Sequence, residues 1–214
     1  HALASKALDE LDIEDNKKLI NLRKLINKTC ISVIEGQYLD IDFETHKEIK
    51  IDDYLEMIEK KTGALIKTSV ILGSALESPD NKTTDIFSEI GKIFGHMFQI
   101  KDDVLGIWGN KEFGKPIGSD ILKKKKSFPI LKLIQTSNSS DKNRINEIFN
   151  NNITKNDKDL ILELMNKYKV ESYCSKILSN KYNLAKSLIK ELDIDDKYIK
   201  MLLEINFFLM NRTK

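Results

Sequence analysis

Residues 98–109 read FQIKDDVLGIWG and place three polar side chains on an otherwise apolar helical stretch. Gln99, Asp102 and Asp103 occupy positions i, i+3 and i+4, so they share one face of a helix. Two adjacent carboxylates in apolar surroundings repel each other and lose hydration, which a divalent cation or a lysine must offset. Oxygen ligands without a nearby His or Cys suit Mg²⁺. The alternative is a solvated acidic pair at a helix end.

The rest of the sequence predicts an all-α fold in a single domain that spans residues 1–214. Only 3 prolines and 9 glycines interrupt 214 residues, and Leu, Ile, Lys and Glu dominate, which favours long helices. Apolar residues recur at helical spacing between Asp15 and Glu44, and they predict one buried face. Its members are Leu19, Leu22, Ile26, Cys30, Val33 and Ile34.

A central, buried helix is expected after Asp52, the predicted N-cap, because the second half of residues 54–77 is apolar nearly all round. Pro79 is expected to end it. The stretch HALASKALDEL at the N-terminus reads as an amphipathic helix. Further helices are predicted at about 83–108, 128–137, 141–150, 156–167, 170–191 and 195–211.

Bulk composition excludes several classes of function. With 35 basic and 33 acidic residues the formal charge is +2, which gives no global electrostatic case for nucleic acid or for an anionic membrane. Cys30 and Cys174 lie far apart without a metal-binding pattern, so we expect reduced thiols and a cytoplasmic protein. No apolar run approaches the roughly 20 residues that span a bilayer, so no transmembrane segment is expected.

Lysines and further polar residues accompany the acidic pair along the chain. Gly36, Gln37 and Asp40 share a helical face, and Gly36 is small enough for a neighbouring helix to approach closely. Lys61 and Thr62 stand at the entry to the apolar helix, where a lysine needs an anionic partner. The loop GNKEFGKPIGSD and the run Lys123–Lys126 follow the acidic pair, so groups suited to metal alternate with groups suited to phosphate.

In order and spacing, five stretches resemble the motifs of trans-type polyprenyl diphosphate synthases, the farnesyl and geranylgeranyl type. They are GQYLD, KKTGALI, FQIKDDVLGIWG, GKPIGSD and KKKKSFPI. The resemblance is strong from about residue 30 to 131 and weaker through the C-terminal helices. It implies an isoprenoid synthase-type helical bundle, a homodimer, and an Mg²⁺-dependent condensation of isopentenyl diphosphate with an allylic diphosphate that releases diphosphate.

Through the same resemblance, the acidic residues acquire expected roles. Asp102 would be a direct magnesium ligand, and Asp103 would assist through water or lysine contacts. Gln99 would sit beside the reacting allylic group. Gln37 and Asp40 would lie on the helix that faces the metal cluster, with Asp40 contacting a bound water or a lysine.

The resemblance also assigns the basic residues. Lys61, Lys115 and Lys125 would grip the allylic diphosphate, with Lys124 or Lys126 as possible substitutes for Lys125. The Thr62 hydroxyl and the Lys61 carbonyl would face the developing carbocation. No protein nucleophile is required, which agrees with the lack of any Ser/His/Asp or Cys/His arrangement.

Two departures from the family pattern stand out. The acidic motif DDxxD reads DDVLG here, with Gly106 in the last acidic position, as in a subgroup whose metal binding is only modestly weakened. No first aspartate-rich motif with a following arginine pair occurs, and HALASKAL resembles the helix that follows this motif. Three interpretations stay open: the chain is a fragment, another polypeptide supplies the missing helices, or the protein is not catalytic.

Other functions also fit parts of the sequence. A terpene cyclase would use the same fold, although GQYLD, KT and GKPIGSD form a prenyltransferase set. A non-catalytic subunit that regulates a complete synthase, or a plain helical interaction module, would need no first motif. His46 and His96 are expected to be structural, and Trp108 is expected to pack in the core.

Overall fold

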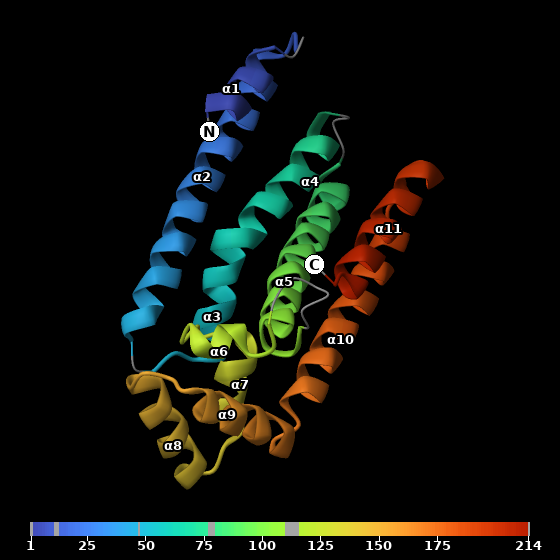
Figure 1. Ribbon diagram of the computed structural model, residues 1–214. Coiled ribbons are helices and arrows are strands. Elements are labelled where there is room, and N and C mark those ends of the chain that lie inside the picture. The colour runs from blue at the N-terminus through green and yellow to red at the C-terminus, as the bar shows by residue number, and fades with distance from the viewer. Residues whose placement is uncertain (1, 11–12, 47, 77–79, 110–115, 214) are drawn as a thin grey trace.

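The computed structural model describes residues 2–10, 13–46, 48–76, 80–109 and 116–213, which form helices and turns without a β-strand among them (Figure 1). The all-α prediction is therefore confirmed. In chain order the elements are α1 (Ala2–Asp9), α2 (Asn16–Thr45), α3 (Ile51–Ile58), the π-helical turn η1 (Glu59–Gly63), α4 (Ala64–Leu76), α5 (Asn81–Trp108), α6 (Ser119–Leu122), α7 (Phe128–Thr136), α8 (Ser139–Asn150), α9 (Lys155–Lys167), α10 (Val170–Lys190) and α11 (Asp196–Asn211).

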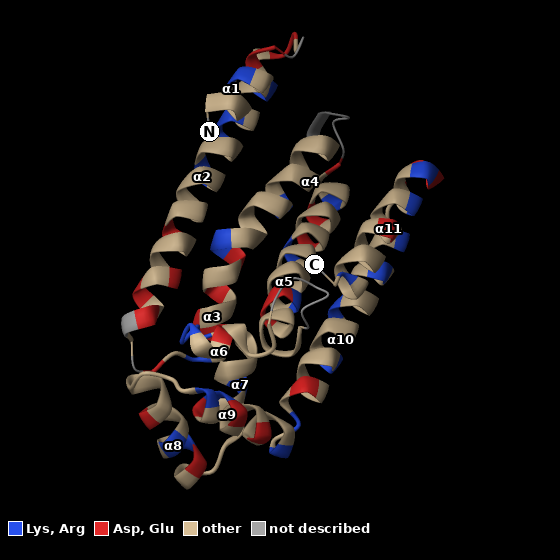
Figure 2. Cartoon of the chain, in the orientation of Figure 1, with Lys and Arg blue, Asp and Glu red and all other residues tan. Residues whose placement is uncertain are grey.

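The long helices stand side by side in a row, and the short helices close one end of it (Figure 1). Helix α4 packs between α2 and α5, α5 packs against α10, and α10 packs against α11. Helices α6 to α9 gather at the end where α3 and the C-terminal end of α5 lie. Charged residues of both signs occur in this region, in α2, α3, α5 and next to α6 (Figure 2).

Helix α5 forms the centre of the hydrophobic core. Its buried residues include Ile90, Phe94, Met97, Ile100 and Ile107, which are at most 2% exposed. Burying each such side chain contributes roughly 1.5–3 kcal/mol relative to leaving it in water. These residues join the apolar faces of α3, α7, α9 and α10 in one core. The helix that carries FQIKDDVLGIWG is therefore held from several sides.

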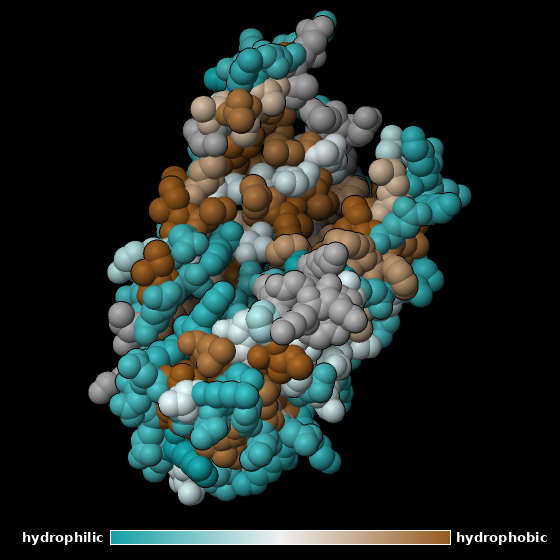
Figure 3. Space-filling view, viewed as in Figure 1, coloured by the Kyte–Doolittle hydropathy of each residue, from teal (hydrophilic) through white to brown (hydrophobic). Residues whose placement is uncertain are grey.

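Helix α4 is less buried than its composition predicted. Leu65 is 60% exposed, although Ile66 and Val70 pack against the core. Hydrophobic side chains gather on the face shown in Figure 3, around α2, α4 and α11. The expectation of a central, fully covered helix at residues 54–77 was thus wrong on one face, because α4 packs between its two neighbours and presents an apolar third side. Likewise Ile34 of α2, expected in the core, is 69% exposed.

Asp15 caps α2, accepting hydrogen bonds from the backbone N–H groups of Lys17 and Lys18. Two other helix starts differ from the expectation. Asp52 is not the N-cap of α3, because Lys50 holds that position and its backbone N–H donates to the Asp53 carboxylate at 2.9 Å. Helix α5 begins earlier than expected, after Asp80. Pro79 lies outside the described residues, and helix α6 was not predicted.

The cysteines and the hydropathy pattern add two observations. Cys30 and Cys174 are both free thiols, and burial, assisted by the nearby Asp103 carboxylate, raises the pKa of Cys174 to about 12. An inert, packed thiol is therefore expected at this position. Within the described ranges, no helix has both the length and the apolar character that crossing a membrane requires.

Candidate active site

Lys61 and Thr62 are presented by the π-helical turn η1, which interrupts the continuous helix from α3 to α4. A π-helical turn holds one more residue than an α-helical turn and often occurs at functional sites. The Lys61 ammonium pairs with the Asp40 carboxylate of α2 at 2.5 Å. This contact supplies the anionic partner that the sequence required for Lys61.

Glycines on both sides of η1 allow two helices to approach its backbone. A Cβ atom at Gly36 of α2 would lie 2.2 Å from the backbone nitrogen of Lys61. A Cβ atom at Gly95 of α5 would lie 2.4 Å from the Gly63 Cα atom. Neither distance is sterically possible, so both positions require glycine while the helices keep this spacing. The predicted close approach at Gly36 is confirmed.

Asp103 is fully buried next to this turn. It accepts hydrogen bonds from the Tyr54 hydroxyl at 2.6 Å, the Lys125 ammonium at 2.7 Å, the Phe128 backbone N–H at 2.8 Å and the Gln99 amide at 3.3 Å. A buried carboxylate persists only when such partners compensate its charge. A metal bond to Asp103 would have to displace at least one of them. The geometry thus favours an indirect role, in which Asp103 positions Lys125.

The lysine run contributes one residue to this cluster. Lys125 lies between the carboxylates of Asp103 and Asp120, the latter at 3.5 Å. Burial alone would lower the pKa of Lys125, but the two carboxylates outweigh burial and raise it above its ordinary value. The side chain remains about one third exposed. A charged ammonium that is fixed in position and open to solvent is suited to bind a phosphate.

A continuous set of side-chain contacts links these residues. The Thr62 hydroxyl donates to the Gln99 carbonyl oxygen at 3.1 Å, and Gln99 in turn donates to Asp103. Lys125 extends the set to Asp120. Residues of η1 and of the C-terminal half of α5 therefore meet α6 and the turn that follows it.

Asp102, unlike Asp103, is only partly covered. Its carboxylate lies 3.4 Å from the guanidinium of Arg212, next to the C-terminus, and Arg212 also stacks 4.1 Å above the Phe98 ring centroid. A separation of 3.4 Å is long for a charge-assisted hydrogen bond. Asp102 is thus the member of the acidic pair whose carboxylate another cation can reach.

Gly106 explains how the departure from DDxxD fits the fold. The Asp120 carboxylate occupies the space beside Gly106, where a Cβ atom would lie 2.2 Å from Oδ2 and 2.4 Å from Cγ. Asp120 is 5% exposed and approaches Lys125. A carboxylate from α6 therefore stands where the motif's last acidic side chain would begin.

One further predicted site residue, Gln37, lies apart from these contacts. Gln37 is exposed on α2, one helical turn before Asp40. Lys115 lies outside the described residues, so its assignment stays a prediction. Trp108 packs against the core at the end of α5, as expected. The expected role of Gln37 has no support from contacts among the described residues.

Three residues near the site gave no signal in the sequence. Tyr54 reaches Asp103 across 49 residues, and Arg212 reaches Asp102 across 110. Burial, and then Asp103, raises the pKa of Tyr54 well above its ordinary value, so the phenol remains a donor. Asp120 belongs to the GSD part of a recognised motif, but its place beside Gly106 follows only from the fold.

A hard cation such as Mg²⁺ requires oxygen ligands. Within the described part of the chain, no group of three or more His, Cys, Asp or Glu side chains is placed to hold a metal ion. Magnesium often binds through one or two carboxylates together with substrate phosphates, and it retains several waters. The accessible Asp102 carboxylate could serve as the protein carboxylate of such a site.

His96 shows how a polar residue is tolerated beside η1. It is buried, its Nδ1 accepts a hydrogen bond from the Lys181 ammonium at 3.0 Å, and its Nε2 lies 3.9 Å from the Glu59 carboxylate. Burial, reinforced by Lys181 and only partly opposed by Glu59, lowers the pKa of His96 to about 4. These contacts agree with the structural role predicted for this histidine.

The buried histidine is expected to make stability pH-dependent. Between about pH 6.5 and about pH 4, the unfolded chain protonates His96 while the folded chain keeps it neutral. The free energy of unfolding therefore decreases by up to about 3 kcal/mol as the pH is lowered through this range. Urea titrations near neutrality and near about pH 4.5 measure the loss. His96→Gln should remove this part of the dependence. An equal dependence in the parent and the variant would count against the buried neutral state.

Comparison with solved structures defines the class of protein. The crystal structure of geranylgeranyl pyrophosphate synthetase from Pyrococcus horikoshii Ot3 matches with a TM-score of 0.88 and 30% identity, over 97% of this chain and 63% of that one. The fold is thus the all-α isoprenoid synthase fold. The family described as polyprenyl synthetase matches residues 1–166, and the chain belongs to this family.

Curated relatives carry related names. A short chain isoprenyl diphosphate synthase of Methanocaldococcus jannaschii is 39% identical over 159 residues, which are 73% of this chain and 47% of the relative. A geranylgeranyl diphosphate synthase of Sulfolobus acidocaldarius is 28% identical over 204 residues, which are 93% of this chain and 61% of the relative. The chain therefore spans about half to three fifths of the length of these relatives.

Proposed function

We propose that this chain is part of an Mg²⁺-dependent prenyltransferase that condenses isopentenyl diphosphate with an allylic diphosphate and releases diphosphate. The observation that carries the proposal is the continuous set of contacts from Thr62 through Gln99 and Asp103 to Lys125 and Asp120. This set of contacts brings the charged Lys125 ammonium and the Thr62 hydroxyl of η1 to one place. Family membership supports the same reaction class.

Several side chains would bind the allylic diphosphate together. Lys61 and Lys125 would bind the diphosphate, Lys115 would add a third ammonium, and Asp40 and Asp103 would hold the first two in position. A magnesium ion bound by Asp102 would supply Lewis-acid neutralisation of the leaving group. Gln99 is expected beside the reacting allylic carbon.

The reaction balances without a protein nucleophile. The C1–O bond of the allylic diphosphate breaks, and an allylic carbocation and diphosphate form. The double bond of isopentenyl diphosphate attacks C1, a new C–C bond forms, and a proton leaves to the departed diphosphate. The Thr62 hydroxyl and the Lys61 carbonyl would stabilise the cation through fixed dipoles in a site that excludes water.

Asp102→Asn is expected to lower the rate of this reaction about 100- to 1000-fold, the usual cost of losing one preorganised electrostatic group. The intact gene product is incubated with isopentenyl and farnesyl diphosphates plus Mg²⁺, and diphosphate release and chain elongation are measured. Glu89→Gln is a matched control, because Glu89 is an exposed acid on the same helix. Equal rates for Asp102→Asn and the parent would refute the role of Asp102.

One observation favours a second candidate, a non-catalytic subunit that regulates a complete synthase. The described residues hold no cluster of three metal-binding side chains, so they offer only part of a metal site. Such a subunit would release no diphosphate by itself but would change the activity of a complete synthase added to the assay. The assay above therefore separates the two candidates.

Homodimerisation is part of the proposal. Ile31, Ile34, Tyr38 and Ile41 are 57–69% exposed and recur at helical spacing along α2. An apolar stripe of this kind is typical of a helix that packs against another subunit. A cytoplasmic location is also proposed, with the free thiols Cys30 and Cys174 in support.

A further inference from the structure

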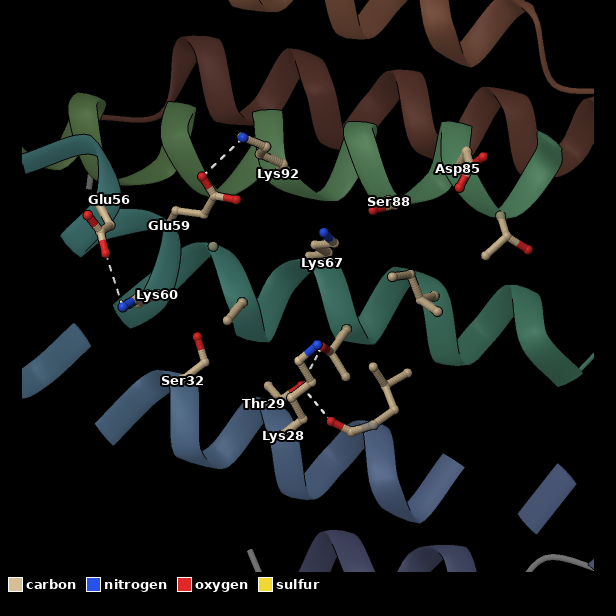
Figure 4. Close-up of a pocket in the computed structure, with 16 residues that line it drawn as sticks. Lys28, Thr29, Ser32, Glu56, Glu59, Lys60, Lys67, Asp85, Ser88 and Lys92 are labelled. Atoms are coloured by element: carbon tan, nitrogen blue, oxygen red, sulfur yellow. Dashed lines mark hydrogen bonds and ion pairs between the residues drawn. The ribbon is translucent and has the colours of Figure 1, made fainter. Parts of the chain in front are cut away.

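A groove of about 600 Å³ lies between α2, α4 and α5 and is separate from the candidate active site (Figure 4). Helix α4 contributes Ala64, Lys67 and Ile71 to its floor. These positions recur at helical spacing, so they share one face of α4.

Among the described residues, two lysines of the groove have no acidic partner. Lys60 pairs with Glu35 and Glu56, and Lys92 pairs with Glu59 at 3.1 Å. In contrast, the structure gives Lys28 and Lys67 no ion pair within the described ranges, although both line the groove. The local charge therefore favours an anion, and Lys28 and Lys67 are the groups with capacity to bind it.

The lysines are grouped at one place in the groove. Lys28 and Lys67 lie near its middle in Figure 4, whereas the remaining acid, Asp85, lies toward one end. The hydroxyls of Ser32 and Ser88 also line the groove and can donate hydrogen bonds. Ammonium groups and hydroxyls together are the donors that phosphate oxygens require.

The groove also offers apolar surface beyond the lysines. Leu25, Ala64 and Ile71 line it, and its volume is several times that of a phosphate group. Binding sites for small organic molecules commonly combine an apolar lining with a few polar groups that fix orientation. A bare phosphate would leave this apolar surface uncovered.

We propose that this groove is a second ligand site, which binds a phosphorylated organic molecule of small size. The phosphate would contact Lys28, Lys67 and the Ser88 hydroxyl, and the apolar part would lie on Leu25 and Ile71. The groove shares η1 with the candidate active site, because Glu59 and Lys60 line the groove while Lys61 pairs with Asp40. The binding claim itself does not depend on the proposed reaction.

The test uses n-hexyl phosphate as the probe, because it has both chemical parts and no allylic group. The ¹⁵N-labelled chain is titrated without Mg²⁺, and amide shifts are followed by NMR. Saturable shifts are expected at Ser32, Ala64 and Ser88. The double variant K28Q/K67Q is expected to weaken binding about tenfold, as the loss of two partly exposed charged contacts implies. Circular dichroism checks that the variant remains folded.

Matched controls define what would overturn the proposal. Lys24→Gln removes an exposed lysine of α2 one helical turn before Lys28 and outside the groove, so binding should not change. Inorganic phosphate should bind more weakly than hexyl phosphate. The proposal is wrong if shifts occur only around Gln99 and Lys125, if K28Q/K67Q binds as the parent does, or if inorganic phosphate binds equally well.

Discussion

Asp103→Asn is expected to lower the free energy of unfolding by about 3 kcal/mol or more, the range found when one partner of a buried ion pair is removed. The parent carboxylate is fully buried and accepts from Tyr54, Gln99, Lys125 and the Phe128 backbone. Asparagine offers one accepting oxygen and turns an NH₂ group toward these donors. Lys125 would then keep its charge without its nearest partner. Urea unfolding at about pH 7 measures the loss.

Asp102→Asn provides the matched control for stability. The same substitution one residue earlier removes a partly exposed carboxylate that lies 3.4 Å from the Arg212 guanidinium. We expect a smaller loss than for Asp103→Asn, because the Asp102 side chain is 27% exposed, although Arg212 itself is buried. If the two variants lost equal stability, the assignment of a structural role to Asp103 and an accessible role to Asp102 would fail.

Gly106→Asp, which restores the common DDxxD pattern, is expected to destabilise the fold by about 3 kcal/mol or more. Its Cβ atom would lie 2.2 Å from the Asp120 carboxylate, and a second buried carboxylate would then face Asp120. Movement of Asp120 would relieve the clash but would separate it from Lys125. Thermal and urea unfolding measure the effect.

Two companion variants separate shape from charge at Gly106. Gly106→Ala adds only the Cβ atom, so we expect a smaller loss of about 1–3 kcal/mol. Combining Gly106→Asp with Asp120→Gly frees the space and should recover much of the stability. A Gly106→Asp variant as stable as the parent would show that Asp120 does not occupy this space.

The sequence predicted the helical fold and most helix bounds because apolar periodicity is a local signal. The buried face of α5 follows directly from this signal, whereas the N-cap expected at Asp52 is held by Lys50. The exposure of Leu65 could not be predicted in this way. An apolar side chain favours contact with other apolar groups. The apolar pattern of the sequence does not show which neighbouring element covers that side chain.

The candidate site was predictable in its residue types and less so in its geometry. The pairing of Lys61 with an acid was expected from its place at an apolar helix, and the contact with Asp40 is found. Asp102 and Asp103 are indistinguishable by spacing, and only tertiary packing buries one and leaves the other accessible. The donation by Tyr54 to Asp103 spans 49 residues, so no local pattern indicates it.

Calorimetric titration of this chain with geranyl diphosphate, with and without Mg²⁺, tests the central claim most directly. We predict binding that strengthens with Mg²⁺, and a loss of about tenfold or more in Asp102→Asn and in Lys125→Gln, since each removes a charged contact to the ligand or its cation. Affinity that is the same with and without Mg²⁺, and unchanged in both variants, would contradict a diphosphate site built on Asp102 and Lys125.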